Sequence, residues 1–335
     1  MKSHTVVFTE PGKVVIEDRD RPTPGPDDLI IKTRCSLVST GTELSILSGE
    51  SEPGTVWSTI CRFPYVPGYD NIGEVVEAGG NVDKSLIGKK VASYGKHAQY
   101  VAVRAENART IHRDIPDEHA VFFTIAEIVM NGIRRGSVGW GESVVVCGLG
   151  LLGQLAVRFC RLCGARPVIA VDIADSRLER LPQDKAIVPV NPTRDDVQSL
   201  VADATRGRKA DVVFEVTGSR EAIPGEVRML RDLGRLVMLG CPRGTTQFDF
   251  HDLCNWPSIS IIGAHNMSHP RHATPQNPWT NHRHAEMFFD LVADGEVQIE
   301  PLISHRVHWS EAPKIYDILV SDRSQAMGVV FDWTN

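Results

Sequence analysis

The chain has 335 residues, of which 42% are hydrophobic and 23% charged, a composition typical of a soluble globular protein with about two domains. Its net charge of −6, without any stripe of Lys and Arg among aromatics, argues against a surface for nucleic acid or an anionic membrane. The first residues lack a long apolar segment, so we expect no secretory signal, and seven cysteines without a framework spacing favour reduced thiols in the cytoplasm.

The first part of the chain is rich in short apolar runs of β type. Turn signals such as Pro11-Gly12 and Gly79-Gly80-Asn81 separate these runs. The pattern predicts a small, mostly β domain of barrel type. The runs are 5–8, 13–16, 29–32, 73–77 and 100–103.

Near residue 120 the pattern changes to helices alternating with strands. A helical pattern over 126–135 precedes apolar strands near 143–147, 167–171, 210–216, 235–239 and 258–262. This alternation predicts an α/β fold with a doubly wound parallel sheet. After about residue 296 the chain turns β-like and loop-like again, so we expect it to return to the first domain.

We therefore predict one domain from 1–120 with 297–335 and a second from 121–296. The stretch 265–284 has little periodicity and holds five histidines and Trp279 among prolines. We expect a long loop there.

The most informative stretch is an apolar strand followed at once by Gly148, Gly150 and Gly153. The first glycine of such a motif permits a tight turn, the second admits the pyrophosphate, and the third lets helix and strand pack closely. The helix N-terminus that follows attracts phosphate. We expect a dinucleotide along Gly148, Gly150, Leu151, Leu152 and Gly153; the alternative is a glycine-rich turn that binds nothing.

Asp172 ends the second strand of this unit, about 24 positions after Gly148. A carboxylate there accepts hydrogen bonds from the ribose hydroxyls and repels a 2′-phosphate, which favours NAD over NADP. Arg177 lies five residues later and softens this preference. Thr217 and Leu239 follow later strands and should border the nicotinamide half, Leu239 through its backbone carbonyl.

Several segments together resemble the medium-chain dehydrogenase/reductase family, across nearly the whole chain. Residues 64–79 are similar to its P-x-x-P-G-H-E-x-x-G-x-V-x-x-x-G motif, 88–91 to its G-D-x-V turn, and 214–218 also fit. The resemblance implies a GroES-like β-barrel domain, a Rossmann domain and a C-terminal return. Residues 39–44 resemble a zinc-less branch that includes bacteriochlorophyllide hydroxyethyl dehydrogenase-like and polyol dehydrogenase-like members.

The resemblance also shows where this chain departs from members that use a catalytic zinc. Thr40 stands at the Cys position, Tyr69 at the His position, and Thr124 near the third ligand. Hydroxyls are poor zinc ligands, and 91–97 lacks the cysteines of a structural zinc lobe. Cys35 is offset from the aligned site and is better interpreted as a core thiol. We therefore predict no zinc of either kind.

Without a metal, side chains must bind the substrate oxygen and move a proton. The resemblance gives Thr42 the position of the proton-relay hydroxyl, while Tyr69 would enter the vacated metal site. Glu43 and Asp70 fall where the family places supporting acids, and burial close together would raise one pKa and make a base. The structural alternatives are a turn cap for Thr42, a core position for Tyr69, and arginine partners for the acids.

A rival proton carrier lies further on. Residues 263–266 align with the family's loop beside the nicotinamide carboxamide, so Ala264 is a cofactor contact and His265 a candidate proton carrier. Asn266 and Trp57 are candidate substrate contacts, although ordinary loop packing explains Trp57 equally well. The other loop histidines are expected to pack, to enclose a polar substrate or to meet a partner subunit.

The leading hypothesis is a zinc-independent, NAD-dependent enzyme that interconverts a secondary alcohol and a ketone. The polar loop favours a sugar, polyol or cyclitol as the small-molecule substrate. Alternatives are a zinc-free NAD(P)H enoyl or quinone reductase, and a dinucleotide-binding sensor without turnover. The resemblance also implies a homodimer.

Overall fold

The computed structural model describes residues 2–322, 324 and 326–334, which fall into two compact units. The first unit comprises the described residues up to Thr124 and from Ala285 onward, and the second runs from Ile125 to His284. Both unit boundaries fall inside helices, α4 (Phe123–Arg135) and α9 (Asn281–Ala293). The roles expected for the two domains remain proposals.

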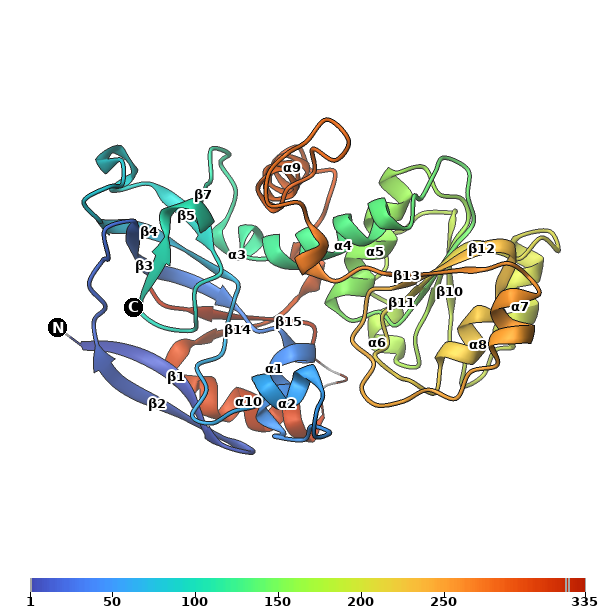
Figure 1. The fold of residues 1–335 in the computed structure, drawn as a ribbon, viewed down its shortest axis with the longest axis horizontal. Helices are drawn as coiled ribbons and strands as arrows, with labels where there is room; N and C mark the ends of the chain where they lie inside the picture. The colour runs from blue at the N-terminus through green and yellow to red at the C-terminus, as the bar shows by residue number, and fades with distance from the viewer. Residues whose placement is uncertain (1, 323, 325, 335) are drawn as a thin grey trace. The chain divides into compact units, whose positions relative to one another are not determined.

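The second unit is built on a six-stranded sheet in which every paired strand is parallel (Figure 1). The strand order is β10-β9-β8-β11-β12-β13, the doubly wound order, so the predicted α/β fold is confirmed. The order reverses between β8 and β11, where such sheets open a crevice at their carboxyl ends. The strands are β8 (Val144–Cys147), β9 (Val168–Val171), β10 (Ile187–Val190), β11 (Ala210–Glu215), β12 (Leu230–Met238) and β13 (Ser260–Gly263).

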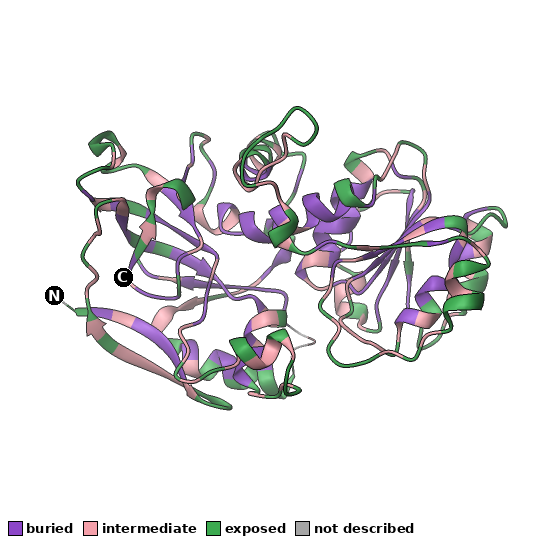
Figure 2. Ribbon diagram, in the orientation of Figure 1, coloured by how far each residue is buried: buried purple, intermediate pink, exposed green. Residues whose placement is uncertain are grey.

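Burial explains why the central strands are continuous apolar runs. All four residues of β8 and of β9 are buried, since helices cover a parallel sheet on both faces (Figure 2). Helix α5 begins at Leu151, directly after Gly150, so that Gly153 lies in its first turn. Asp196 caps α7 through the N–H groups of Gln198 and Ser199. These helices are α5 (Leu151–Leu162), α6 (Asp175–Leu178), α7 (Val197–Ala204) and α8 (Ile223–Val227).

The first unit contains an antiparallel ribbon of β1 and β2 and a seven-stranded sheet. In this sheet β3 pairs with β4, β6 and β15, so a C-terminal strand completes a sheet begun near the N-terminus. A strand from the end of the chain therefore lies in the sheet of the first unit. The strands are β1 (Lys2–Glu10), β2 (Lys13–Asp20), β3 (Asp28–Leu37), β4 (Asn71–Ala78), β5 (Lys90–Ser93), β6 (Tyr100–Arg104), β7 (Arg109–Thr110), β14 (Ile303–His308) and β15 (Gly328–Asp332).

Helices of the first unit close an apolar cluster that the sequence patterns did not reveal. Ile315, Tyr316 and Leu319 pack with Phe8 and Ile46. The expectation of only β and loop structure after residue 296 is thus wrong for α10, whose apolar residues recur at helical spacing. The helices are α1 (Thr40–Leu47), α2 (Val56–Ile60), α3 (Asp117–Ala120) and α10 (Ala312–Ser321).

The long loop predicted for 265–284 ends earlier than expected, because α9 begins at Asn281. The Thr280 hydroxyl accepts a hydrogen bond from the N–H of Arg283, as a helix N-cap does. The buried apolar residues of this helix are Ala285, Phe288 and Phe289. They follow residue 284, so the stretch 265–284 contains no apolar pattern that indicates the helix.

All seven cysteines are free thiols. Among the helices that the structure describes, none is both long and apolar enough to cross a bilayer.

A buried acidic pair lies in the second unit. Glu226 of α8 and Glu215 of β11 are both buried, at 2% and 0% exposed. Burial, together with the charge of Glu215, raises the pKa of Glu226 to about 8. Glu226 is therefore protonated at neutral pH in the folded chain.

This pair predicts a pH dependence of stability. Between pH 4.5 and about 8 the folded state keeps a proton on Glu226 that the unfolded state has lost. The free energy of unfolding therefore falls as pH rises through this window, by at most about 1.4 kcal/mol per pH unit. Replacing Glu226 with Gln (E226Q) removes this loss, so its Tm advantage over the parent should grow from pH 5 to pH 8. Equal Tm differences at both pH values would contradict this, and E296Q at an exposed site is the control.

Candidate functional site

Two of the three motif glycines stand where no side chain fits. Gly148 has φ of +93°, and a Cβ there would lie 2.9 Å from the backbone nitrogen of Thr217. A Cβ on Gly153 would lie 1.8 Å from the carbonyl oxygen of Gly148. A Cβ on Gly150, in contrast, would meet nothing within 4 Å. The outer glycines thus close the turn, and the middle one faces open space suited to a pyrophosphate.

Asp172 fastens this turn from the end of β9. Its carboxylate accepts hydrogen bonds from the backbone N–H groups of Leu149 (2.7 Å) and Ala174 (2.8 Å) and a longer one from Arg177 (3.3 Å). Its side chain is mostly buried, and oxygen lone pairs remain for further donors. Leu151 is buried on α5, whereas Leu152 is half-buried. This arrangement fits a nucleotide whose ribose hydroxyls face the acid.

The carboxyl ends of β11, β12 and β13 lie at the same edge of the sheet as the glycine turn. Glu215 accepts hydrogen bonds from the Thr217 hydroxyl and the Gly218 N–H, both at 2.7 Å. The N–H of Leu239 bonds to the Glu215 carbonyl, and that of Ala264 bonds to the Met238 carbonyl. The structure therefore brings Thr217, Leu239 and Ala264 to the ends of adjacent strands, where ligands of such sheets bind.

In the first unit, three hydroxyl groups form a cluster. The Tyr69 hydroxyl bonds closely to the Ser39 hydroxyl and lies 3.4 Å from the hydroxyl of Thr42 on α1. Burial and the neighbouring Asp70 raise the pKa of Tyr69 well above its usual range. Tyr69 thus stays a neutral phenol, which donates a hydrogen bond and does not act as a phenolate base.

The buried carboxyl group of Glu43 connects this cluster to other parts of the first unit. Its carboxylate accepts from the Ser39 N–H (3.0 Å), from Nε2 of His97 (3.2 Å) and from the hydroxyl of Tyr316. The expected alternative, an arginine partner, is wrong for Glu43. Three donors around one buried carboxylate hold it in place, and the first of them restrains the backbone at Ser39.

A second layer supports His97. Its Nδ1 lies 2.8 Å from the Ser36 hydroxyl, which accepts a hydrogen bond from the Trp333 indole at 2.9 Å. In the neutral ring, Nδ1 accepts from Ser36 and Nε2–H donates to Glu43. No local sequence pattern marks Ser36, Ser39, His97 or Tyr316 as site residues. Tyr316 lies 273 positions from Glu43, so no local pattern could connect the two.

The remaining residues predicted in this unit have different environments. Asp70 is fully buried next to Tyr69, and the Thr124 hydroxyl donates to the Tyr69 carbonyl at 3.2 Å. Trp57 of α2 is half-buried and packs against the apolar cluster around Phe8, which favours its structural interpretation. His265 and Asn266 belong to the second unit.

The residues at the family's zinc positions do not fit a zinc ion. Thr40, Tyr69 and Thr124 offer hydroxyls, which are poor zinc ligands. Burial raises the pKa of the nearby Cys35 thiol well above its usual value. Within residues 2–322, 324 and 326–334, one group of three metal-capable side chains is close together, Glu118, His119 and Glu300. Arg306 already bonds to both of its acids.

His265 is exposed in the second unit, and its Nδ1 accepts a hydrogen bond from the Met267 N–H at 3.2 Å. Its carbonyl accepts from the side chain of Asn131 on α4. Asn266 is half-buried, and its carbonyl accepts from Nδ1 of His269 at 2.7 Å. The loop from 264 to 269 is therefore tied to its own unit at several points.

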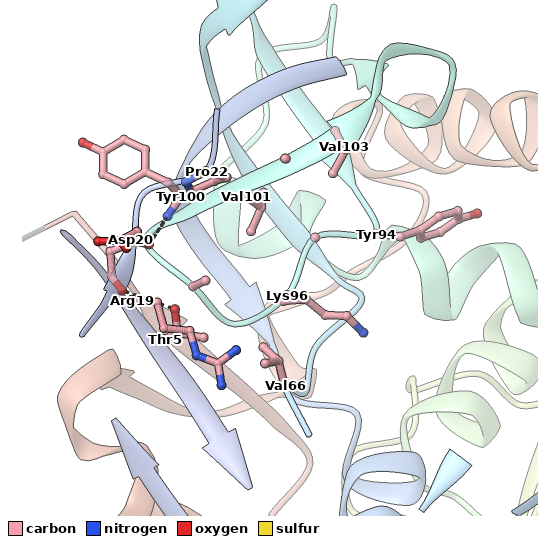
Figure 3. A pocket seen from close by; sticks show the side chains of 14 residues that line it. Thr5, Arg19, Asp20, Pro22, Val66, Tyr94, Lys96, Tyr100, Val101 and Val103 are labelled. Carbon is pink, nitrogen blue, oxygen red and sulfur yellow. Dashed lines mark hydrogen bonds between the residues drawn. The ribbon is translucent and has the colours of Figure 1, made fainter. Parts of the chain in front are cut away.

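A pocket of about 340 Å³ in the first unit contains none of the predicted site residues (Figure 3). Thr5, Arg19, Lys96 and Val101 are among the residues that line it. Figure 3 shows the rings of Tyr94 and Tyr100 directed away from each other at its rim. We do not assign the reaction to this pocket, since the hydroxyl cluster and the glycine turn lie elsewhere.

Comparison with known proteins agrees with this organisation. Residues 25–121 match the alcohol dehydrogenase GroES-like domain, and residues 152–278 match the zinc-binding dehydrogenase family. The chain is 28% identical over 268 residues to D-guloside 3-dehydrogenase of Escherichia coli K12, covering 78% of this chain and 76% of that one. It is 26% identical over 318 residues to L-threonine 3-dehydrogenase of Pyrococcus furiosus, covering 86% of each.

Solved structures share the whole fold. An alcohol dehydrogenase of E. coli CFT073 complexed with NADH superposes with a TM-score of 0.84, at 18% identity and 99% coverage of both chains. A dehydrogenase of Sinorhizobium meliloti 1021 bound to NADP superposes with a TM-score of 0.82, at 24% identity and 99% coverage. The GroES-like and Rossmann domains expected from the sequence are thus confirmed, and the chain belongs to the medium-chain alcohol dehydrogenase family of dinucleotide-dependent oxidoreductases.

Proposed function

We propose that this enzyme interconverts a secondary alcohol and a ketone with NAD and without zinc. The substrate class that we favour is a hydroxyl-rich compound such as a sugar, polyol or cyclitol. The observation that carries the proposal is the cluster of Ser39, Thr42 and Tyr69, which places two further hydroxyls beside Tyr69, the residue at the family's His position. Relatives that act on sugars and alcohols support this class.

The hydroxyl cluster supplies what the substrate's oxygen requires. The bound dinucleotide accepts or supplies the hydride. In the oxidising direction the alcohol's O–H proton must leave, and Thr42 is the hydroxyl that we assign to relay it, accepting that proton while its own proton passes on to water. In the reducing direction Tyr69 donates to the carbonyl oxygen, because its raised pKa keeps the phenol protonated.

Glu43 and Asp70 complete the proposed site as buried acids. We assign Glu43 a positioning role, since its three donors hold Ser39 and so the partner of the Tyr69 hydroxyl. Burial, and after it the neighbouring Asp70, raise the pKa of Tyr69 and keep its phenol neutral. His265 stays the rival proton carrier, with Asn266 and Trp57 as candidate substrate contacts.

NAD specificity is proposed from Asp172, and Arg177 does not reverse it because its guanidinium bonds to that same carboxylate. A 2′-phosphate would meet a buried negative charge. We further propose a cytoplasmic homodimer. Free thiols support the compartment, and the exposed edge strand β13, with Ile261 42% exposed, supports pairing of two sheets.

The cofactor preference is tested by replacing Asp172 with Asn. Loss of a hydrogen bond to a charged group costs about 1.5–3 kcal/mol, so kcat/KM for NAD should fall about 10- to 100-fold. The value for NADP should stay equal or rise, because the repulsion is gone. D203N on the exposed surface of α7 serves as control, and a parallel loss for both cofactors would contradict the assignment.

The role of Tyr69 is tested by its replacement with Phe. Removing a donor to a developing oxyanion typically costs about 100-fold or more in kcat, and we expect Y69F to show this loss with little change in KM for NAD. Y100F removes a hydroxyl at the rim of the separate pocket and should keep full activity. A Y69F enzyme as active as the parent would remove Tyr69 from the mechanism.

The proposed independence from zinc is tested by the zinc content of the protein and by its activity after chelation. Purified active protein should contain well below one zinc per chain by elemental analysis. Its turnover should survive prolonged treatment with a strong chelator, because Thr40, Tyr69 and Thr124 offer no soft ligand. Stoichiometric zinc, with activity lost on chelation and restored on zinc addition, would refute this part of the proposal.

A substrate panel separates the proposal from its alternatives. Sugars, polyols and cyclitols are assayed with NAD, and enones and quinones with NADH and NADPH. Reduction of enones alone would favour the reductase, and saturable dinucleotide binding without any turnover would favour the sensor.

A further inference from the structure

A chain of hydrogen bonds crosses the second unit from helix α4 to the 264–269 loop. Nε of Arg134 donates to Nε2 of His284 at 3.0 Å. Nδ1 of His284 lies 2.8 Å from Nε2 of His269, whose Nδ1 lies 2.7 Å from the carbonyl oxygen of Asn266. All four residues belong to the same compact unit.

The groups at the two ends of this chain of hydrogen bonds determine which atom donates and which accepts in each bond. A guanidinium has no acceptor, so Nε2 of His284 must carry a lone pair. A carbonyl has no donor, so Nδ1 of His269 must carry a hydrogen. The middle bond then runs from Nδ1–H of His284 to Nε2 of His269. Both rings are neutral and in the same Nδ1–H tautomer.

The surroundings of His284 oppose its protonation. Its side chain is fully buried, and Trp279 stacks on it with ring centroids 5.5 Å apart. The charged and titratable groups facing it are Arg134 from α4, Arg283 from α9 and His269 from the loop. Burial, then His269 and the two guanidiniums, lower the pKa of His284 to about 3.

The chain of hydrogen bonds ends at the 264–269 loop, which other hydrogen bonds also hold. Asn131 of α4 donates to the carbonyl of His265 (3.3 Å) and to the hydroxyl of Ser268 (2.8 Å). Helix α4 thus holds the segment directly through Asn131 and indirectly through Arg134. The N–H of Ala264, the first residue of the loop, bonds to the carbonyl of Met238 at the end of β12. The loop is therefore held in one conformation on the strand-end edge described above.

We propose that Arg134 and the neutral imidazoles of His284 and His269 form a hydrogen-bond relay that positions the 264–269 loop for the dinucleotide. The assignment rests on the proposed function in one respect, that this loop borders the nicotinamide. His269 and His284 are positioning residues in this proposal, because they act on the cofactor through the backbone at Asn266.

The relay itself is tested without any cofactor. In protein labelled with ¹⁵N-histidine at pH 7, both rings should show the Nδ1–H neutral tautomer. Their resonances are assigned by their loss in H269Q and H284Q. A Nε2–H tautomer or an imidazolium at either position would overturn the relay.

Its positioning role is tested by NADH binding. Replacing His284 with Phe keeps a ring against Trp279 and removes both hydrogen bonds, and we expect the Kd for NADH to rise about tenfold. H284Q retains a donor and an acceptor, so it should restore Kd to within about threefold of the parent. H112F, at an exposed histidine of the other unit, is the matched control.

A double-mutant cycle adds a signature that loss of packing alone would not produce. Links of one relay act in series, so H269F with H284F should raise Kd about as much as either change alone. Additive effects, or H284Q binding as poorly as H284F in folded protein, would overturn the positioning role. If the parent binds no pyridine nucleotide, the proposed function fails, while the ¹⁵N spectra still decide the relay.

Discussion

The contact that the nucleotide-binding unit depends on is the one between Gly153 and the carbonyl oxygen of Gly148. A single methyl group at Gly153 would come within 1.8 Å of that oxygen, closer than any side chain tolerates. The approach brings the first turn of α5 onto the end of β8. Asp172 then bonds to the N–H of Leu149 and fastens the turn from the neighbouring strand. The position of the helix N-terminus, and hence of any phosphate it binds, follows from these contacts.

The first unit depends in a similar way on one buried acidic side chain, the carboxyl group of Glu43. Its donors come from the chain just before α1, from the segment between β5 and β6, and from α10 near the C-terminus. Removing a buried carboxylate from water is costly unless several donors replace the lost hydration. The same three donors therefore join distant parts of the unit and hold the backbone that bears the Ser39 hydroxyl.

Each unit contains a chain of hydrogen bonds that begins at a group able only to donate. Such a group determines the direction of the hydrogen bonds that follow it. Trp333 can only donate to Ser36, and a guanidinium can only donate to His284. Such ends leave each interior group one compatible hydrogen arrangement. The hydroxyls of the first unit are the groups that we propose for the chemistry, and the imidazoles of the second unit are those that we propose for positioning.

Local sequence was enough to determine the Rossmann strands, the helix after the glycine turn and the acid at the end of β9. Buried parallel strands require continuous apolar runs, and the turn requires glycine at fixed offsets, so both leave patterns in the sequence. Tertiary structure alone decided what surrounds Glu43, because Tyr316 is 273 positions away. It also decided the role of His284, which sequence reasoning left among loop histidines and which α9 places against His269 and Arg134. Hydrogen bonds between side chains distant in sequence depend on packing, which leaves no period or spacing in the sequence to be recognised.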